Sequence, residues 1–140
     1  MMNRHELRER LFKLLFRIEF NSPEEMPEQI KMFCEDAENG TLETEDGEYV
    51  TGKYEKIMNL KEEIDKTIDE NASGWDITRI GKVELAILRL SVYELCYDED
   101  IPTGVAMNEA VELAKKFGQD NSGAFVNAVL SKIKTARGIE

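Results

Sequence analysis

The sequence has few of the residues on which catalysis and covalent cross-linking depend. Its 140 residues include one histidine, two cysteines and three prolines. Cys34 and Cys96 are far apart in apolar helical patterns, which favours buried thiols in a reducing compartment over a disulfide. There is no CxxC pair, no HExxH motif and no glycine-rich phosphate loop, and His5 has no Ser or Cys at a motif spacing. We therefore expect no catalytic residue, no metal and no cofactor.

Long apolar runs and strand-like alternation are also missing. No run could span a membrane, and the charged start MMNRHELRER leads into an amphipathic segment, which excludes a secretory signal. The composition, 41% hydrophobic and 34% charged, is typical of a helix-rich globular protein. We expect a cytoplasmic, all-α protein of about seven helices in one or two small bundles, with residues 1–140 forming one domain.

The charge is strongly negative but unevenly distributed. The net charge is -11, which would ordinarily disfavour a nucleic-acid partner because phosphate binding depends on Lys and Arg. Residues 1–20 hold five basic and three acidic side chains, whereas residues 21–72 hold five basic and sixteen acidic ones. The two ends of the chain therefore remain available to an anionic ligand.

Apolar residues at helical spacing predict a first helix with two apolar sides. One side consists of Leu7, Leu11, Leu14, Leu15 and Ile18. The other is a stripe of Phe12, Phe16 and Phe20 at i, i+4 and i+8, largely across the helix from the leucines. The stripe has two readings: it packs within the chain, or it is an exposed surface for a partner.

Five further helices follow the same spacing, and turn residues separate them. The second runs from Met26 to Ala37 and closes near Asn39 and Gly40. The segment TLETEDGE, residues 41–48, is expected to be an acidic loop. A longer helix covers residues 50–68, and Asn71 through Gly74 end it. RIGKVELAILRLSVYELCY, residues 79–97, is apolar nearly all round, as a central bundle helix would be.

The last two predicted helices are joined by the polar stretch that follows Phe117. Gly118 is expected to end the first of them as a left-handed C-cap, and Asp120, Asn121 or Ser122 can cap the second. Phe125 lies at the edge of the inward-facing stripe, beside free helix-start amides that attract phosphate. It either packs in the core or stacks on an unpaired base.

The N-terminal helix also carries a cluster of basic residues: Arg4, Arg8, Arg10, Lys13 and Arg17. Arginine suits phosphate and base contacts because it stays charged and donates in a planar fork. The alternative is a solubilising face, since Glu6 and Glu9 lie among the arginines and reduce the local potential.

Three phrases of the sequence, taken in order, resemble a known family. RIGKVELAILRLSVYEL, PTGVAMNEAVELAKKFG and FVNAVL are similar to the C-terminal half of the bacterial antitermination factor NusB. The resemblance implies an all-helical fold of two small packed bundles. It also implies a non-enzymatic factor that binds boxA RNA of nascent ribosomal RNA leaders. In this role it acts with the ribosomal protein NusE, and the two help assemble an antitermination complex on RNA polymerase.

The same resemblance implies roles for individual residues. Those implied to bind RNA are Arg4, Arg8, Arg10, Asn121 and Phe125. Those implied to meet the protein partner are Phe12, Phe16 and Glu84. Glu84 is a carboxylate in a nearly all-apolar helix, so an internal pair with Arg79 or Lys82 is its alternative. Arg89 and Glu109 are read as structural, with a mutual ion pair as a hypothesis.

Two other functions are compatible with the resemblance. One is the NusB-like domain that precedes the catalytic part of certain ribosomal RNA methyltransferases, although no methyl-donor site fits in a chain that ends at Glu140. The other is a homodimer through the phenylalanine stripe, as a storage form that masks the RNA site. A free-standing adaptor is the favoured interpretation.

Overall fold

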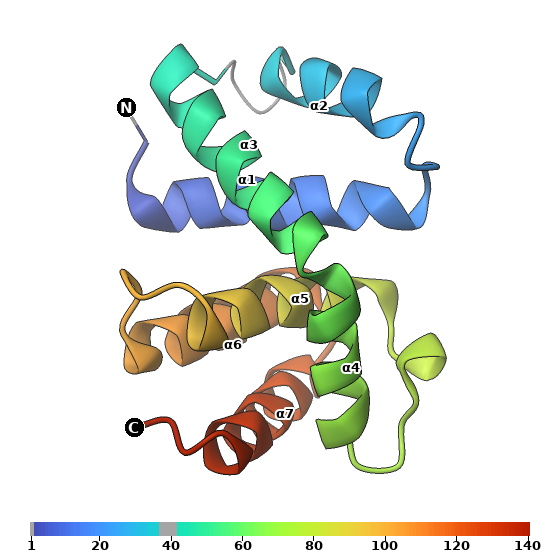
Figure 1. Ribbon diagram of the computed structural model, residues 1–140, viewed down its shortest axis with the longest axis vertical. Helices are drawn as coiled ribbons and strands as arrows, with labels where there is room; N and C mark the ends of the chain where they lie inside the picture. The colour runs from blue at the N-terminus through green and yellow to red at the C-terminus, as the bar shows by residue number, and fades with distance from the viewer. Residues whose placement is uncertain (1, 37–41) are drawn as a thin grey trace. The chain divides into compact units, whose positions relative to one another are not determined.

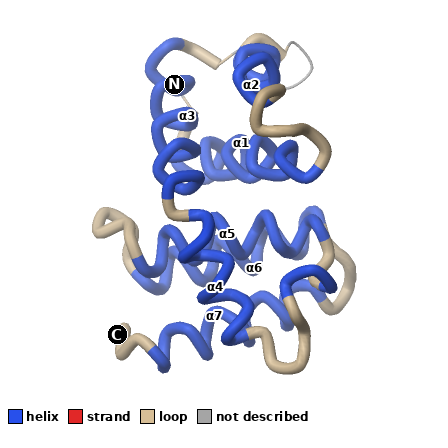
Figure 2. The backbone as a smooth tube through the Cα atoms, turned by 45° about the vertical axis from the view of Figure 1, so that its right-hand side comes forward, coloured by secondary structure: helices blue, strands red, loops and turns tan. Residues whose placement is uncertain are grey.

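The computed structural model describes residues 2–36 and 42–140. Within that part of the chain it contains seven α-helices, two short 3-10 helices and no strand (Figure 2). This confirms the all-α prediction of about seven helices. The contacts divide the chain into two units, Met1–Met58 and Asn59–Glu140. The single domain over 1–140 stays a prediction.

The first unit begins with helix α1 (Arg4–Phe16), whose start is fixed by a capping box. The backbone N–H of Glu6 donates to the side chain of Asn3 at 2.8 Å, and the N–H of Asn3 donates back to the Glu6 carboxylate at 3.4 Å. Leu7, Leu11, Leu14 and Leu15 are buried, as the periodicity predicts. A 3-10 turn, η1 (Arg17–Glu19), ends the helix, so Phe20 lies just beyond the helical segment.

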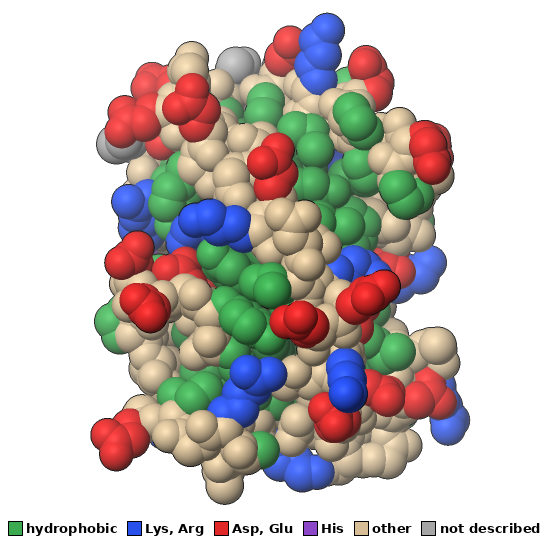
Figure 3. Space-filling model, viewed as in Figure 1, with side chains coloured by type: hydrophobic (Ala, Val, Ile, Leu, Met, Phe, Trp, Pro, Cys, Tyr) green, Lys and Arg blue, Asp and Glu red, His purple; other side chains and the backbone are tan. Residues whose placement is uncertain are grey.

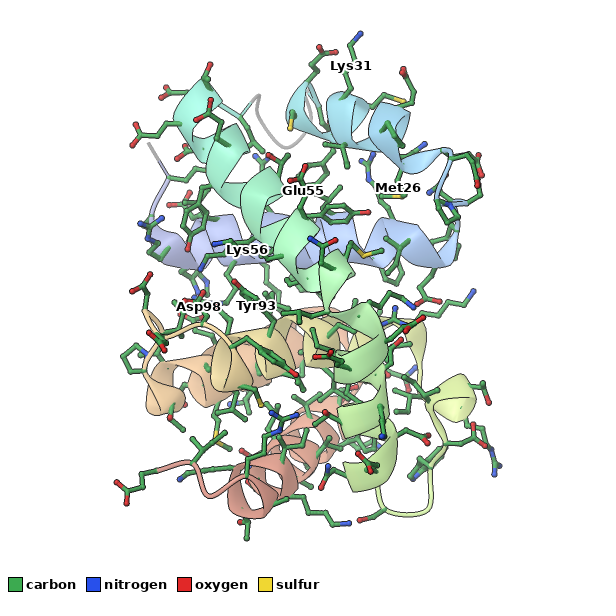
Figure 4. All side chains as sticks on the ribbon, in the orientation of Figure 1. Met26, Lys31, Glu55, Lys56, Tyr93 and Asp98 are labelled. Atoms are coloured by element: carbon green, nitrogen blue, oxygen red, sulfur yellow. The ribbon has the colours of Figure 1, made fainter. Side chains whose placement is uncertain are left out.

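Helices α2 (Met26–Cys34) and α3 (Thr44–Asn59) complete this unit (Figure 1). Met26 and Phe33 of α2 are buried, whereas Lys31 projects outward (Figure 4). The predicted end near Asn39 and Gly40 falls outside the described residues, and α2 already ends at Cys34.

The acidic stretch at 41–48 was wrongly predicted to be a loop. Thr41 lies outside the described residues, but Thr44 through Glu48 form the start of α3. Acidic side chains are favourable there because the helix N-terminus carries partial positive charge. Asp46 is buried, and one of its carboxylate oxygens accepts from the backbone N–H of Met2 at 3.0 Å.

The long helix predicted over residues 50–68 is broken in two. Helix α3 ends at Asn59 and helix α4 (Lys61–Asn71) begins after Leu60, whose φ of -105° and ψ of 5° are not helical. Ile57 and Ile64 on either side are buried and keep helical spacing across the break, so periodicity alone does not reveal it. The predicted end of α4 at Asn71 through Gly74 is confirmed, and Gly74 has a φ of +81°, which favours glycine.

The second unit is a bundle of α4, α5 (Lys82–Cys96), α6 (Thr103–Phe117) and α7 (Ser122–Ala136). A 3-10 helix, η2 (Ile77–Arg79), lies between α4 and α5. Helix α5 packs on α6 and α7, α6 packs on α7, and α4 packs on α5 and α7 (Figure 1). Every residue of α5 from Leu85 to Leu95 is buried, which confirms the prediction of a central helix.

A buried arginine ties α4 to α5 in this unit. The Arg89 Nε and one terminal nitrogen donate to the two carboxylate oxygens of Asp65 at 2.8 and 3.0 Å. Lys61 also contacts the Asp65 carboxylate, at 3.1 Å. Sequence analysis suggested Glu109 as the partner of Arg89 and did not identify Asp65. Such a two-pronged contact adds geometric specificity as well as energy, and it fixes α4 on the central helix.

Replacing Asp65 by Ala should lower the free energy of unfolding by about 3 kcal/mol. That is the lower end of the cost of breaking a buried ion pair, because the Asp65 side chain retains 19% of its exposure. Urea denaturation measures the change. Glu62→Ala is the control, since Glu62 is exposed on the same helix. Equal stability of the two variants would contradict a structural role for the pair.

Candidate RNA and partner surfaces

The turn between α6 and α7 is fixed by the side chain of Ser122. Its hydroxyl oxygen accepts from the backbone N–H of Gln119 at 2.8 Å, and the Ser122 N–H donates to the Gln119 carbonyl at 3.0 Å. Asn121 occupies the N-cap position of α7, but its side chain makes no capping hydrogen bond and is exposed. The side chain that organises this turn is therefore buried Ser122, while the Asn121 amide faces solvent.

Gly118 has a different role from the one predicted. Its φ of -96° and ψ of -158° are extended, so the predicted left-handed C-cap is wrong. A Cβ at this position would lie 2.6 Å from Ser122 Cβ and 2.7 Å from the Ala114 carbonyl oxygen. Glycine is required because Ser122 and the end of α6 come so close to it.

A cavity of about 150 Å³ opens beside the start of α7. It is lined by Trp75, Arg79, Ile80, Gly81, Glu84, Asn121, Ser122 and Phe125. The Trp75 and Phe125 rings meet edge to face, with centroids 6.4 Å apart and planes at 74°. The Arg79 guanidinium carbon lies 5.7 Å from the Trp75 ring centroid. The cavity thus joins aromatic faces to polar groups, as ligand sites commonly do.

The cavity brings together residues that sequence analysis assigned to different roles. Asn121 and Phe125 were expected to bind RNA, whereas Glu84 was expected to meet a protein partner. Trp75 and Arg79 were assigned to neither. Trp75 is the single tryptophan of the sequence, which was the available signal, but nothing in the sequence shows that it lies against Phe125.

The connection that carries Trp75 is held by several hydrogen bonds. Asp76 caps η2 by accepting from the Thr78 N–H at 3.0 Å, and the Thr78 hydroxyl also donates to this carboxylate. The hydroxyl bond is the main reason that the pKa of Asp76 lies below its usual value. Lys132 of α7 donates to the Ser73 hydroxyl at 2.9 Å, which ties the connection to the same helix as Phe125.

The N-terminal arginines differ in accessibility. Arg4 is exposed, and its guanidinium carbon lies 4.1 Å from the centroid of the Tyr49 ring. Lys53 approaches the same ring at 4.8 Å. Arg8 and Arg10 are only 6% and 7% exposed, so a solubilising face does not describe them. Within the described residues the Nη1 nitrogen of Arg10 is buried with no hydrogen-bond partner.

The phenylalanine stripe passes from buried to exposed along its length. Phe12 is 3% exposed, Phe16 is half-buried and Phe20 is 59% exposed. The ring centroids of Phe12 and Phe16 are 6.3 Å apart, and those of Phe16 and Phe20 are 5.1 Å apart in an edge-to-face pair. Phe12 is therefore packed within the chain while Phe20 is open to solvent, and a partner surface on the stripe stays a prediction.

The described part of the chain contains two thiols and no candidate metal site. No group of three or more His, Cys, Asp or Glu side chains there could hold a metal ion. Cys34 and Cys96 are free and half-buried, and burial raises the pKa of both thiols.

The face in Figure 3 carries acidic and basic side chains interspersed. No helix among the described residues is long and apolar enough to cross a membrane.

Comparison with known proteins defines the class of this helical, non-repetitive chain. The profile of the NusB family matches residues 5–135. The transcription antitermination protein NusB of Agathobacter rectalis is 48% identical over 131 residues, covering 94% of this chain and 98% of that protein. That of Lachnoclostridium phytofermentans is 44% identical over 132 residues, with the same coverage. The chain belongs to the NusB family.

Solved structures agree with this assignment. Thermotoga maritima NusB superposes with a TM-score of 0.83 at 31% identity, covering 96% of this chain and 92% of that one. A crystal structure of the antitermination factors NusB and NusE in complex with dsRNA gives a TM-score of 0.79 at 30% identity, covering 95% and 96%. The expected NusB-like fold is thereby confirmed.

Replacing Gly118 by Ala should destabilise the protein by about 1–3 kcal/mol, as overpacking does elsewhere. The added Cβ would collide with the Ala114 carbonyl, which is backbone and cannot move aside. Gly104→Ala is the matched control, because a Cβ there meets nothing within 4 Å. Urea denaturation compares them, and an unchanged midpoint for both variants would refute the close-approach explanation.

Proposed function

We propose that this protein is a transcription antitermination factor. It binds boxA RNA of nascent ribosomal RNA leaders together with NusE and helps assemble the antitermination complex on RNA polymerase. The observation that carries the proposal is the near-complete match to proteins named as such, one of them 48% identical over 94% of the chain. The likeness to a NusB bound to NusE and RNA over 95% of the chain supports it.

The role proposed is binding and assembly, with no catalysis by the protein itself. Such a factor works where RNA polymerase works, which in bacteria is the cytoplasm. A homodimer through the phenylalanine stripe is a second candidate state, favoured by the 59% exposure of Phe20 and the 51% exposure of Met32. A contiguous exposed aromatic patch favours association.

The RNA surface is proposed to include Arg4, Arg8, Arg10, Asn121 and Phe125. Exposed Asn121 offers an amide, and Phe125 offers a half-buried ring beside the start of α7. The first turn of a helix presents backbone N–H groups with no partner inside the helix, which suit a phosphate oxygen. Arg4 is the arginine of this set that is open to solvent.

The partner surface is proposed to include Phe12, Phe16 and Glu84. Phe16 is its centre, because it contacts both neighbouring rings of the stripe. Phe12 is buried, packs beside Phe16 and presents little surface of its own. Aromatic anchors of this kind often dominate the binding energy of protein interfaces.

The test of the proposed function is binding of boxA RNA with and without NusE. Fluorescence anisotropy should show preference for boxA over a scrambled sequence, and NusE should strengthen it. Because Arg4 is the one proposed RNA-binding arginine that is open to solvent, the salt dependence should be shallow, with each contact adding about 0.7 to the logarithmic slope. Phe125→Ala should cost about 1–3 kcal/mol if the ring stacks on a base. Absence of any boxA preference in the presence of NusE would refute the function.

Replacing Phe16 by Asp should abolish binding of NusE while the protein stays folded, because a charge replaces the central ring of the stripe. Isothermal titration calorimetry measures the binding, and circular dichroism checks the helix content. Lys31→Asp is the control, since Lys31 is exposed on α2, away from the stripe in sequence. Loss of helicity in the Phe16 variant would instead assign this ring to the core.

A further inference from the structure

Two positive charges meet on one tyrosine ring in the first unit. Arg4 begins α1, and Tyr49 and Lys53 lie on α3, where side chains four residues apart are neighbours. The Arg4 guanidinium carbon lies 4.1 Å from the Tyr49 ring centroid, and the Lys53 ammonium nitrogen lies 4.8 Å from the same point. We call these three residues the Tyr49 cluster.

Asp46 holds the start of the chain beside this cluster. One of its carboxylate oxygens accepts from the backbone N–H of Met2 at 3.0 Å, and Asp46 lies one turn before Tyr49 on α3. Its side chain is buried, and its Oδ1 has no hydrogen-bond partner among the described residues. Burying a carboxylate with one oxygen unpaired is unfavourable. It occurs here where it fixes the backbone two residues before Arg4, which favours a functional reason for it.

The Tyr49 cluster offers positive charge and hydrogen-bond donors. Arg4 is exposed, whereas Tyr49 and Lys53 are half-buried. The face of the ring stabilises each cation, but the two cations repel one another at this separation. An anion in contact with both removes that repulsion. Because neither a guanidinium nor an ammonium group can accept a hydrogen bond, the ligand that fits is an anion rich in acceptors.

A phosphate group of a nucleic-acid backbone meets these requirements. It is negatively charged, and each of its two non-bridging oxygens can accept from one of the two cations. Guanidinium and ammonium groups are both common phosphate ligands. With two cations over it, the half-buried Tyr49 ring offers little free face to an unstacked base. The contact that the cluster favours is therefore to the backbone of the RNA.

We infer that Arg4 and Lys53, gathered on Tyr49, bind one backbone phosphate of the RNA, and that Asp46 is a positioning residue for Arg4. The inference rests on the proposed function and adds helix α3 to the RNA surface. A phosphate contact fixes orientation and carries no sequence information. The cluster thus contributes affinity to boxA and to a scrambled RNA alike.

The charge of Lys53 is tested by the salt dependence of RNA binding. Affinities of the full chain with saturating NusE are measured by fluorescence anisotropy over a series of salt concentrations. Lys53→Gln should weaken binding and lower the logarithmic salt slope by about 0.7, which corresponds to one phosphate contact with a single strand. The loss should be the same for boxA and for the scrambled sequence.

Lys31→Gln is the matched control for this substitution. It removes the same charge from an exposed position of the same unit, on α2, away from the Tyr49 cluster in sequence. The salt slope of this variant should equal that of the unmodified protein. Tyr49→Leu should reduce the slope as Lys53→Gln does, whereas Tyr49→Phe should not, because only the latter keeps the ring. Thermal unfolding checks that each variant folds.

The positioning role of Asp46 is tested in two backgrounds. Asp46→Ala should weaken RNA binding of the otherwise unmodified protein and have no further effect when Arg4→Gln is already present. Residues that act through one contact are non-additive in this way. Asp46→Asn keeps an acceptor for the Met2 N–H and should restore most of the loss. An equal effect of Asp46→Ala in both backgrounds would show that Asp46 has only a structural role.

The outcomes separate this inference from the proposed function. If boxA binds specifically but Lys53→Gln has the affinity and salt slope of Lys31→Gln, the phosphate site is refuted and the function stands. If Lys53→Gln instead weakens binding of NusE in the absence of RNA and leaves the salt slope intact, the cluster binds a carboxylate of the protein partner, and the inference is again refuted. If the unmodified protein does not bind boxA, both fail.

Discussion

The close approach of Ser122 to Gly118 is the constraint on which the candidate RNA surface depends. It sets where α7 begins, and through the hydrogen bond from Gln119 to the Ser122 hydroxyl it turns the exposed Asn121 amide toward solvent. The same helix start then carries Phe125 into the cavity with Trp75. Packing of α6 on α7 thus positions the residues of this helix start that are proposed to bind RNA.

A second constraint positions the other wall of that surface. The buried Arg89–Asp65 pair fixes α4 on α5, and the connection between these helices carries Trp75 and Arg79. Lys132 then ties the connection to α7. The cavity therefore follows from helix packing inside one unit. We propose that an acidic protein, with a net charge of -11, binds an anionic chain here through stacking and hydrogen bonds more than through phosphate contacts.

Much of the fold could be predicted from the sequence, because helical periodicity reports burial. The all-α class, the central helix around residues 82–96 and the buried leucines of α1 all follow from that periodicity. The break at Leu60 could not be predicted, since the apolar spacing continues across it. The left-handed C-cap at Gly118 was predicted from residue type alone. It is wrong because glycine is required there by the close approach of Ser122, four positions later in the next helix.

The candidate site was less predictable because its parts are distant in the sequence. Nothing local brings Glu84 to Asn121 or Trp75 to Phe125, and spacing within one helix cannot show that Arg8 and Arg10 are buried. The proposed assignments of Arg4, Asn121 and Phe125 came from family resemblance, and their geometry came from the structure.

Emission from Trp75 tests the central claim most directly, because the chain contains a single tryptophan. Titration with boxA RNA should quench or shift that emission. Anisotropy of labelled RNA follows binding in parallel, and the emission change should saturate at the same RNA concentration as the binding. Saturated binding with unchanged tryptophan emission would contradict the claim that RNA occupies the cavity at the start of α7.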